Sequence, residues 1–366
     1  MTRLTKGMLG NPVRVIVVDH STLFRRLVSE LLETDGTIEV IGTASDPYSA
    51  RKKINELDPD VITLDVEMDG MDGITFLGHL MRLRPMPVVM VSSLTEHGAE
   101  VTLEALSLGA IDVVTKPKLD VIVAFKEQGP ELRSKVIAAC HTTPKRLLPN
   151  TARLATQSNG RLRLRSPGQL ITIGASTGGT QAVREVLAQM PSDSPCILIT
   201  QHIPESFSRS FAMRLNENSA MTVQQASDGD PLVAGHAYVA PGDQHLEIVR
   251  SGTGFACRLT RNSPVNHHRP SVDVLFASAA KLVGRNATGV LLTGMGADGA
   301  KGLLAMREAG AHTLCQDQSS SVVWGMPGAA VMLRAACEVL PLDQIADGIL
   351  SNVKRPTGKV GKQNAA

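Results

Sequence analysis

The sequence predicts two α/β domains, joined by a basic linker and followed by a short tail. Three observations lead to this prediction. The chain has 366 residues, which is long for a single domain. Short apolar runs rich in β-branched residues alternate with helical stretches in two separate blocks. Between the blocks the alternation fades and the composition becomes basic and polar. We expect the domains at 12–130 and 167–352, a flexible linker at 131–166 and a disordered tail at 353–366.

The first block predicts a doubly wound, five-stranded parallel sheet. Helical stretches such as Thr22–Glu33 and Ala99–Leu108 lie between the apolar runs, as crossover connections in a parallel sheet require. A further helix is expected at Glu131–Ala139, at the start of the linker. The strand candidates are Val13–Val18, Ile38–Ala44, Val61–Leu64, Val88–Val91 and Val113–Thr115.

The second block predicts a mostly parallel α/β domain with an antiparallel hairpin. The hairpin joins His245–Val249 to Phe255–Leu259 through a four-residue loop, Ser251–Gly254. The other strand candidates are Leu170–Ile173, Cys196–Thr200, Ala237–Val239, Val290–Thr293, Thr313–Cys315 and Glu338–Leu340. The helix candidates are Thr180–Gln189, Ser206–Glu217, Ser271–Val283, Ala300–Ala309 and Gly328–Ala335.

Composition excludes several classes of protein. A net charge of +2 and an aromatic content of 3% argue against a nucleic-acid partner, which calls for a basic excess or stacking aromatics. No apolar run approaches the length of a membrane helix, and the N-terminus lacks the apolar core of a secretory signal. The five cysteines are widely spread without a CxxC pair, which argues against a disulfide frame and a zinc site. We therefore expect a cytoplasmic protein that does not insert into membranes.

Four polar residues stand at the carboxyl ends of strands in the first block: Asp19, Asp65, Ser92 and Lys116. The carboxyl ends of parallel strands form the ligand crevice of a doubly wound sheet, so these side chains should converge. Two carboxylates suit a hard divalent cation, most plausibly Mg²⁺. Asp65 would then attack a phosphoryl group, whose oxygens the metal, Lys116 and Ser92 neutralise.

The stretch from Pro12 to Lys118 resembles the receiver domain of two-component response regulators. The resemblance rests on LDVEMDGMDG at Leu64–Gly73 and VTKP at Val114–Pro117. It implies that Asp65 is the phospho-acceptor, that a histidine kinase is the phosphodonor and that the backbone carbonyl of Glu67 is a metal ligand. Most receivers carry two adjacent acids after the first strand, whereas this chain has Asp19-His20. Because a neutral imidazole is a poor ligand for Mg²⁺, we expect weakened Mg²⁺ binding.

The second block carries a serine, a histidine and an aspartate after three different strands. Gly174–Gly179 fits G-x-S-x-G between a strand and a helix, with Ser176 as the exposed nucleophile. His202 and Asp298 each follow another strand, so all three reach the same edge of the sheet and supply nucleophile, base and orienting carboxylate. Backbone N–H groups near Thr177 or Met295 are the candidates for an oxyanion hole.

Two other interpretations of these motifs stay open at this point. The serine loop is an ordinary turn if the second domain is a non-catalytic binding module tethered to the receiver. Gly294, Gly296 and Gly299 also match the dinucleotide fingerprint G-x-G-x-x-G after a strand and before a helix. Asp298 argues against that reading, because a carboxylate at the helix N-terminus would repel a pyrophosphate.

Other histidines of the second block compete with His202 for a role in the chemistry. His267-His268-Arg269 precedes a helix, and we expect His268 and Arg269 to contact substrate, with a capping or surface role as the equal alternative. Arg269 could bind an acidic group through its two-pronged guanidinium. His245 opens a hairpin strand, so a structural role is expected.

The stretch from Gln169 to Leu350 resembles the catalytic domain of the chemotaxis protein-glutamate methylesterases, the CheB family. The resemblance implies a triad of Ser176, His202 and Asp298, and hydrolysis of glutamate methyl esters on chemotaxis receptors to glutamate and methanol. It also implies glutamine deamidation there, no metal in the esterase domain, and an unphosphorylated receiver that covers the esterase cleft. The motifs that carry it are Gly174–Gly179, Gln201–Pro204, Asn266–Phe276 and Leu292–Ala300.

Overall fold

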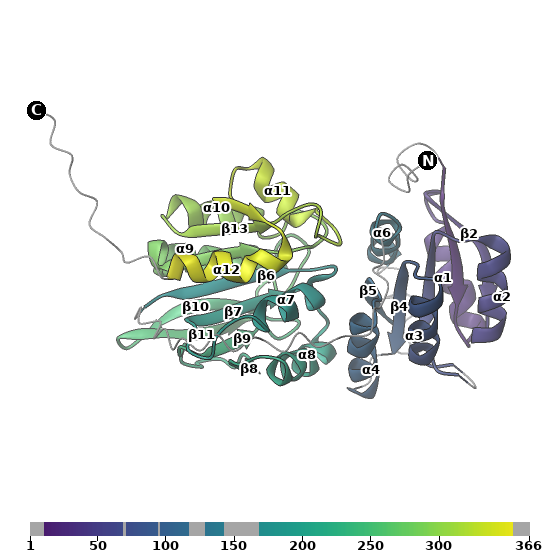
Figure 1. Ribbon diagram of the computed structural model, residues 1–366, viewed down its shortest axis with the longest axis horizontal. Coiled ribbons are helices and arrows are strands. Elements are labelled where there is room, and N and C mark those ends of the chain that lie inside the picture. Colours follow the sequence, from purple (N-terminus) through teal and green to yellow (C-terminus); the bar gives the residue numbers. More distant parts are fainter. Residues whose placement is uncertain (1–10, 69–70, 94–95, 117–128, 143–167, 354–366) are drawn as a thin grey trace, which may run out of the picture.

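The computed structural model describes residues 11–68, 71–93, 96–116, 129–142 and 168–353. Two α/β domains lie next to each other, one around a five-stranded sheet and the other around a seven-stranded sheet (Figure 1). The predicted fold class is therefore confirmed. Residues 143–166 of the predicted linker and residues 354–366 of the predicted tail lie outside the described residues.

The N-terminal sheet has the strand order β2-β1-β3-β4-β5, and every neighbouring pair is parallel. Its strands are nearly continuous apolar runs because helices cover both faces. Side chains cap the helices: Ser21, Asp46 and Asp72 each accept a hydrogen bond from a backbone N–H in the first turn. The elements are β1 (Val13–Val18), α1 (Thr22–Leu32), β2 (Ile38–Ala44), α2 (Pro47–Leu57), β3 (Val61–Asp65), α3 (Gly73–Leu83), β4 (Val88–Ser93), α4 (Glu96–Ser107) and β5 (Asp112–Lys116).

Helix α6 (Gly129–Cys140) packs onto this first domain. Leu132 and Val136 are fully buried in one cluster with Leu27 and Leu31 of α1. Lys135 donates a hydrogen bond to the Val113 carbonyl on β5. The sequence places this helix in the linker, but its apolar face completes the receiver core, so the described residues after 130 are structurally part of the first domain.

The C-terminal sheet has the order β14-β13-β12-β6-β7-β9-β8, also with parallel neighbours, and a separate antiparallel pair joins β10 to β11. Its strands are β6 (Leu170–Ala175), β7 (Cys196–Gln201), β8 (Thr222–Gln225), β9 (His236–Val239), β10 (His245–Ser251), β11 (Gly254–Thr260), β12 (Ala287–Leu291), β13 (His312–Gln316) and β14 (Glu338–Leu340). Its helices are α7 (Gly179–Leu187), α8 (Glu205–Glu217), α9 (Val272–Leu282), the short 3₁₀ helix η2 (Gly284–Asn286), α10 (Ala300–Glu308), α11 (Met326–Met332) and α12 (Leu342–Val353).

Three details of the second domain differ from the sequence prediction. The hairpin loop has two residues instead of four, because Ser251 pairs with Gly254 and Gly252 adopts a positive φ of 54°. Strand β12 begins and ends earlier than predicted, since the chain leaves the sheet after Leu291 to form the loop that carries Asp298. The short edge strand β8 and helix α12 were not predicted at all.

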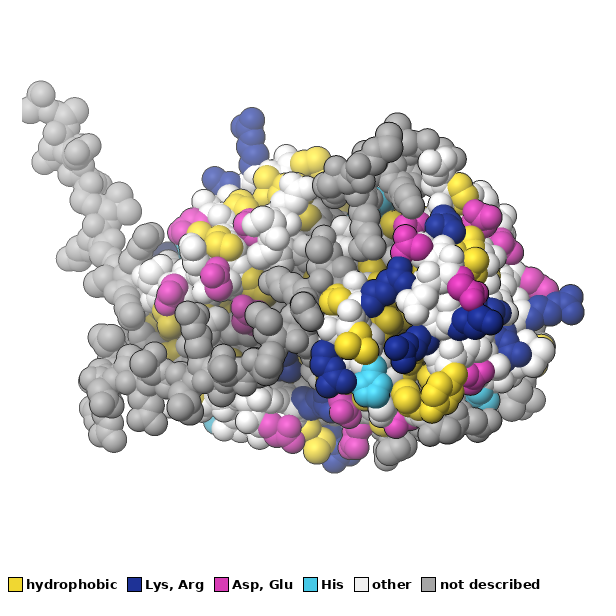
Figure 2. Space-filling view, turned by 45° about the vertical axis from the view of Figure 1, so that its right-hand side comes forward, with side chains coloured by type: hydrophobic (Ala, Val, Ile, Leu, Met, Phe, Trp, Pro, Cys, Tyr) yellow, Lys and Arg dark blue, Asp and Glu magenta, His cyan; other side chains and the backbone are white. Residues whose placement is uncertain are grey.

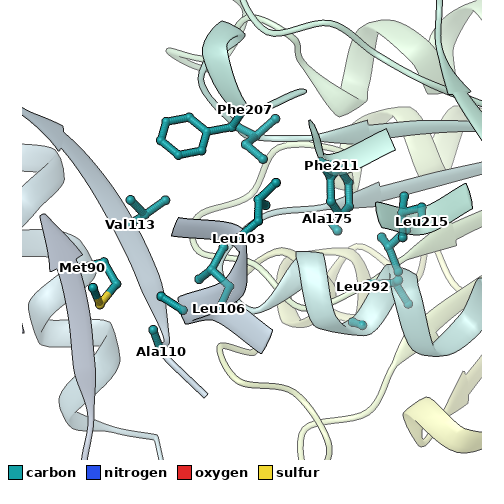
Figure 3. Close-up of a cluster of buried hydrophobic side chains, with 14 of the residues drawn as sticks. Met90, Leu103, Leu106, Ala110, Val113, Ala175, Phe207, Phe211, Leu215 and Leu292 are labelled. Atoms are coloured by element: carbon teal, nitrogen blue, oxygen red, sulfur yellow. The ribbon is translucent and has the colours of Figure 1, made fainter. Parts of the chain in front are cut away.

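The two domains share one buried apolar cluster. Leu103 and Leu106 of α4 lie near Phe211 and Leu215 of α8, and all four side chains belong to the same core (Figure 3). The domains are therefore docked through apolar side chains, which are costly to expose to water.

The surface agrees with the balanced charge of the chain. Acidic and basic side chains are interspersed over the face in Figure 2, without a large region of one sign. In the described part of the chain, no helix combines the length and the apolar character needed to cross a bilayer. None of the five cysteines, all of which lie in the described part of the chain, forms a disulfide bond.

Candidate functional site

The nucleophile loop leaves the middle of the second sheet. Ser176 directly follows β6, which lies between β7 and β12. The loop is tied to the segment that follows β12, because the Ser176 N–H donates to the Thr293 carbonyl at 3.0 Å and Thr293 Oγ1 donates to the Thr177 carbonyl at 2.9 Å. Gly178 has a positive φ of 75° and caps α7, so the serine faces the N-terminus of a helix.

His202 lies beside Ser176 because of the register of β6 and β7. Ala175 pairs with Gln201, and the next residue on each strand is Ser176 and His202. The His202 N–H donates to the Ala175 carbonyl at 3.2 Å. The imidazole Nε2 is 2.8 Å from Asp298 Oδ2, whereas the buried Nδ1 has no partner in the described part of the chain. Nδ1 is therefore the nitrogen available to the serine hydroxyl.

Asp298 is almost completely buried within a shell of donors. Ser271 Oγ and Asn266 Nδ2 each donate to Oδ1 at 2.7 Å, and the Val272 N–H donates to Oδ2 at 2.6 Å. Burial alone would raise the pKa of Asp298 and favour the neutral acid. The hydrogen bond and the charge of His202, together with the hydrogen bonds from Asn266 and Ser271, lower the pKa by more than burial raises it. The pKa of Asp298 is therefore held well below its usual range, and the carboxylate stays charged beside the imidazole.

The proposed oxyanion donors come from the nucleophile loop and from the loop after β12. Within the described ranges, neither the Thr177 nor the Met295 backbone N–H has a hydrogen-bond acceptor. Thr177 follows the serine at the start of the helix turn, and Met295 lies in the loop after β12. Both assignments stay predictions, but both groups are free to bind a developing negative charge.

The structure separates the histidine and arginine candidates. The ring of His268 stacks on that of His202, with centroids 3.7 Å apart and planes 15° from parallel. Burial, and secondly the charge of His202, lowers the pKa of His268 to about 4, so it is neutral at pH 7. Arg269 instead donates to Asp243 Oδ1 and to the Arg261 and Asn262 carbonyls. Its guanidinium is thus engaged in holding a loop, while His268 lies in the site.

His245 has the expected structural role, since its Nδ1 accepts from the Ser271 N–H and its Nε2 contacts the Ser263 carbonyl.

Gln201 is a functional candidate that the sequence analysis missed. Its buried side-chain amide donates to the Ser176 carbonyl at 2.9 Å and to the His202 carbonyl at 3.1 Å. One side chain thereby fixes the backbone of both nucleophile and base. The residue type at a strand end was visible in the sequence, but the two contacts depend on the side-chain rotamer, which only the structure gives.

Three of the four predicted receiver residues, Asp19, Asp65 and Lys116, meet at the carboxyl ends of their strands. Lys116 Nζ lies 2.7 Å from Asp19 Oδ2 and 2.8 Å from Asp65 Oδ2, and all three side chains are buried. Ser92 is fully buried on β4 and accepts a hydrogen bond from Thr102 Oγ1. The Glu67 N–H donates to Asp65 Oδ1 at 3.3 Å, which places the backbone of Glu67 at this site.

The two receiver carboxylates have the character of a cation site. Burial raises the pKa of the Asp19 carboxyl, and the negative charge of Asp65 raises it further. The charge of Lys116 lowers this pKa but does not cancel the rise. Two carboxylates thus lie against a single lysine, and a bound cation would favour the charged form of both. Oxygen ligands at this spacing fit a divalent cation, and His20 adds a ring nitrogen to the same cluster.

The docked receiver reaches the nucleophile loop. Thr177 Oγ1 donates a hydrogen bond to Asp112 Oδ2 at the start of β5. Lys135 of α6 forms ion pairs with Asp112 and Glu131. The charge of Lys135 holds the pKa of Glu131 below its ordinary value, and the charges of His268 and His202 act in the same direction. Receiver groups are thus electrostatically coupled to the esterase site.

Comparison with known proteins agrees with both halves of this arrangement. A family model described as response regulator receiver domain matches residues 15–125, and one described as CheB methylesterase matches residues 171–349. A protein-glutamate methylesterase/protein-glutamine glutaminase of Xanthomonas oryzae pv. oryzae is 53% identical over 350 residues, which cover 94% of this chain and 98% of the relative. A relative of the same description from Hydrogenovibrio crunogenus is 48% identical over 94% of this chain and 99% of its own length.

A solved structure supports the second domain directly. The CheB methylesterase catalytic domain of Thermotoga maritima is 34% identical, covers 51% of this chain and 99% of its own, and superposes with a TM-score of 0.50. The fold and the matched families define a response regulator receiver joined to a methylesterase output domain. The chain belongs to the CheB family of protein-glutamate methylesterases/protein-glutamine glutaminases.

Proposed function

We propose that this chain is a phosphorylation-regulated serine esterase that hydrolyses glutamate methyl esters on chemotaxis receptors and deamidates glutamines there. Ser176 is the nucleophile, His202 the general base and Asp298 the residue that orients the imidazole. The observation that carries the proposal is the arrangement around His202: Nε2 is bound by a charged carboxylate, and a buried, unpartnered Nδ1 lies beside the serine strand.

The acylation step follows from this geometry. His202 Nδ1 takes the proton of the Ser176 hydroxyl as Oγ attacks the ester carbonyl. The Thr177 and Met295 N–H groups bind the oxyanion, and the positive end of α7 adds to their effect. When the tetrahedral intermediate collapses, His202 returns the proton to the leaving oxygen, and methanol departs.

Deacylation repeats the sequence with water. His202 takes a proton from water, which attacks the acyl-serine carbonyl, and the Ser176 oxygen leaves with the proton. The products are a free glutamate side chain and the regenerated hydroxyl. At a glutamine the same steps release ammonia in place of methanol, so deamidation needs no further residue.

The receiver supplies the regulation. Asp65 accepts the phosphoryl group from a histidine kinase, with Lys116 and Ser92 to neutralise its oxygens. Asp19, Asp65 and the Glu67 carbonyl would hold a divalent cation, for which the sequence predicts Mg²⁺. A cation bound there offsets the negative charge of the phosphoryl oxygens. The contact of Asp112 with Thr177 supports inhibition by the unphosphorylated receiver, because it holds the residue next to the nucleophile. We also propose that the protein is located in the cytoplasm.

A serine-directed fluorophosphonate probe tests the esterase assignment. The probe should label wild-type protein at Ser176 and should not label Ser176→Ala, whereas Ser227→Ala, at an exposed serine, should label normally. Hydrolysis of a γ-glutamyl methyl ester peptide, followed by methanol release, should fall by as much as ~10⁶ in kcat for Ser176→Ala and by ~10⁴ for Asp298→Asn. Asp347→Asn, at an exposed acid of α12, is the control for the second variant.

The same experiment separates the alternatives. A receiver tethered to a binding module would give no labelling and no methanol. Undiminished hydrolysis by Ser176→Ala would overturn the nucleophile assignment. The dinucleotide interpretation has no support from the relatives, and the loop glycines serve close packing: a Cβ on Gly294 would lie 2.8 Å from Ser176 Cβ.

A further inference from the structure

The phosphorylation site contains a third candidate metal ligand besides its two carboxylates. Asp19, His20 and Asp65 each offer one ligand atom, and these atoms all lie within 4.8 Å of one another. His20 Nδ1 is 2.6 Å from Asp65 Oδ2 and 3.9 Å from Asp19 Oδ1. The carboxylates are buried, while the imidazole is 41% exposed.

The turn after β1 holds the imidazole over the site. Ser21 N–H donates to Asp19 Oδ1 at 2.8 Å, which fixes the carboxylate at the start of the turn. Arg25 Nη1 donates to the Asp19 and His20 carbonyls at 2.7 and 3.0 Å. The backbone of His20 is therefore anchored on both sides, and its Nδ1 lies 2.6 Å from the carboxylate of the phospho-acceptor.

We infer that His20 is a metal ligand and shifts the ion selectivity of this site from the expected Mg²⁺ to Mn²⁺. Mg²⁺ demands near-octahedral oxygen ligands and gives up its waters reluctantly, so an imidazole in the cluster disfavours it. Mn²⁺ accepts the same carboxylate and water oxygens and lies in the series of ions that bind nitrogen donors. Zn²⁺ fits less well, because its protein sites are mostly four-coordinate with nitrogen and sulfur ligands.

The distances are compatible with a shared ion. Adjacent ligands of an octahedral ion with bonds of about 2.1 Å are separated by about 3.0 Å. The observed 2.6 Å between His20 Nδ1 and Asp65 Oδ2 needs only a small rotation to reach that value. Binding requires the Nδ1 lone pair, so the ring proton must move to Nε2, which faces away from the two carboxylates.

The competing explanation is that His20 only donates a hydrogen bond to Asp65. In that case the imidazole would compete with any cation for the carboxylate oxygen, and its removal would improve binding of Mn²⁺ and Mg²⁺ alike. The two explanations predict opposite effects of the same substitution, which makes the inference testable without any measurement of catalysis. Only the effect of His20 on phosphorylation rests on the proposed function of the receiver. Metal binding by His20 can be measured whether or not Asp65 is phosphorylated.

The test is Mn²⁺ binding to the full chain, followed by the electron paramagnetic resonance signal of the free ion, with Mg²⁺ affinity from competition. His20→Ala should weaken Mn²⁺ binding by about tenfold or more. His20→Asp should tighten Mg²⁺ binding and so reverse the preference. His79→Ala, which removes an exposed histidine of α3, should bind both ions as the wild-type protein does.

A second measurement tests the inference on the wild-type protein itself. The electron spin echo envelope of Mn²⁺ bound to wild-type protein should show modulation from a directly coordinated ¹⁴N, and His20→Ala should lack it. Absence of ¹⁴N modulation in the wild-type protein would overturn the inference. Unchanged or tighter Mn²⁺ binding by His20→Ala would overturn it as well and would establish the hydrogen-bonding role.

Discussion

Gln201 connects the two reacting side chains through their backbones. Its Nε2 donates to the carbonyls of Ser176 and His202, and the Ser176 carbonyl also accepts from the Gly179 N–H. Loss of the amide removes one donor from each carbonyl, and a typical hydrogen bond contributes about 0.5–1.5 kcal/mol, so this part of the loop should relax. A positioning role of this kind acts on the geometry of attack and leaves substrate affinity largely alone.

Gln201→Met should therefore lower kcat by about 10- to 100-fold with little change in KM. The measurement is steady-state hydrolysis of a γ-glutamyl methyl ester peptide, together with the rate of fluorophosphonate labelling of Ser176. Gln189→Met, at an exposed glutamine after α7, is the matched control. A rise in KM at constant kcat would show that Gln201 binds substrate and does not position the nucleophile.

His268 gives the catalytic domain a specific sensitivity to acid. Its pKa is lowered to about 4 in the folded protein, first by burial and then by the charge of His202, whereas Asp298 and Glu131 favour its protonation and Lys135 opposes it. An unfolded histidine has a pKa of about 6.5. Between these values the unfolded chain binds a proton that the folded chain does not, so the free energy of unfolding should fall as the pH drops from 6.5 toward 4.

His268→Phe keeps an aromatic ring in the stack and removes the titration. The acid-induced loss of stability between pH 6.5 and 4 should shrink in this variant, while the contribution of Asp298, whose pKa is held well below its usual range, is lost only at lower pH. Denaturation followed by the fluorescence of Trp324, the only tryptophan, reports the catalytic domain. His267→Asn at the exposed neighbour should behave as wild type. An unchanged pH dependence in His268→Phe would contradict the assigned cause.

At the scale of the elements, the loop after β12 explains why its glycines resemble a dinucleotide fingerprint. A Cβ on Gly294 would lie 2.2 Å from Met326 Sδ and 2.8 Å from Ser176 Cβ. The glycine is needed so that the loop carrying Asp298 can pass close to the nucleophile and to α11. The glycine pattern therefore allows close contact between this loop, the nucleophile and α11. It does not indicate close contact with a pyrophosphate.

Gly294→Ala should therefore destabilise the catalytic domain by about 1–3 kcal/mol and lower kcat, because either Met326 or the nucleophile loop must move. Gly78→Ala on α3 is the control, since no heavy atom lies within 4 Å of its added Cβ and alanine favours a helix. Thermal unfolding and ester hydrolysis are measured for both variants. Equal behaviour of the two would mean that close packing at Gly294 has no consequence.

The elements that the sequence predicted best are the buried parallel strands. The run Val13–Val18 was predicted to the residue, because a central strand covered on both faces is nearly continuously apolar. Strand β8 was missed because it is a four-residue edge strand with mostly exposed side chains. Helix α12 was missed although its face is buried, since its apolar spacing overlaps the segment expected to lead into the tail.

The sites were predictable where position along a strand decides the geometry. Ser176, His202 and Asp298 reach one edge of the sheet because each follows a parallel strand, and the sequence shows this directly. The shell around Asp298 was not predictable: Asn266 and Ser271 come from a loop whose path no periodicity defines. For the same reason the engagement of Arg269 by Asp243 was not foreseen.

At the scale of the whole molecule, the docking of the two domains is the feature that the sequence could not give. Leu103 and Leu106 have the spacing of ordinary core residues of α4, and nothing in that spacing shows that they face another domain. Val322, in the loop after β13, likewise packs against the receiver cluster that contains Leu132. These contacts hold the receiver against the nucleophile loop, so their strength should set the basal activity.

Weakening the α4–α8 contact should activate the esterase without phosphorylation. Leu106→Lys places a charge in the shared apolar cluster, which disfavours docking, and should raise the basal rate of ester hydrolysis toward that of a fragment starting near Arg165. Leu83→Lys, at a leucine of α3 that is 68% exposed, should leave the rate unchanged.

Acetyl phosphate with a divalent cation should activate wild-type protein but not Asp65→Asn. It should add little to the activity of Leu106→Lys, because the receiver of that variant is already undocked. If Leu106→Lys and the fragment are no faster than the unphosphorylated wild type, the docked receiver does not inhibit, and regulation must act elsewhere, while the roles of Ser176 and His202 are untouched.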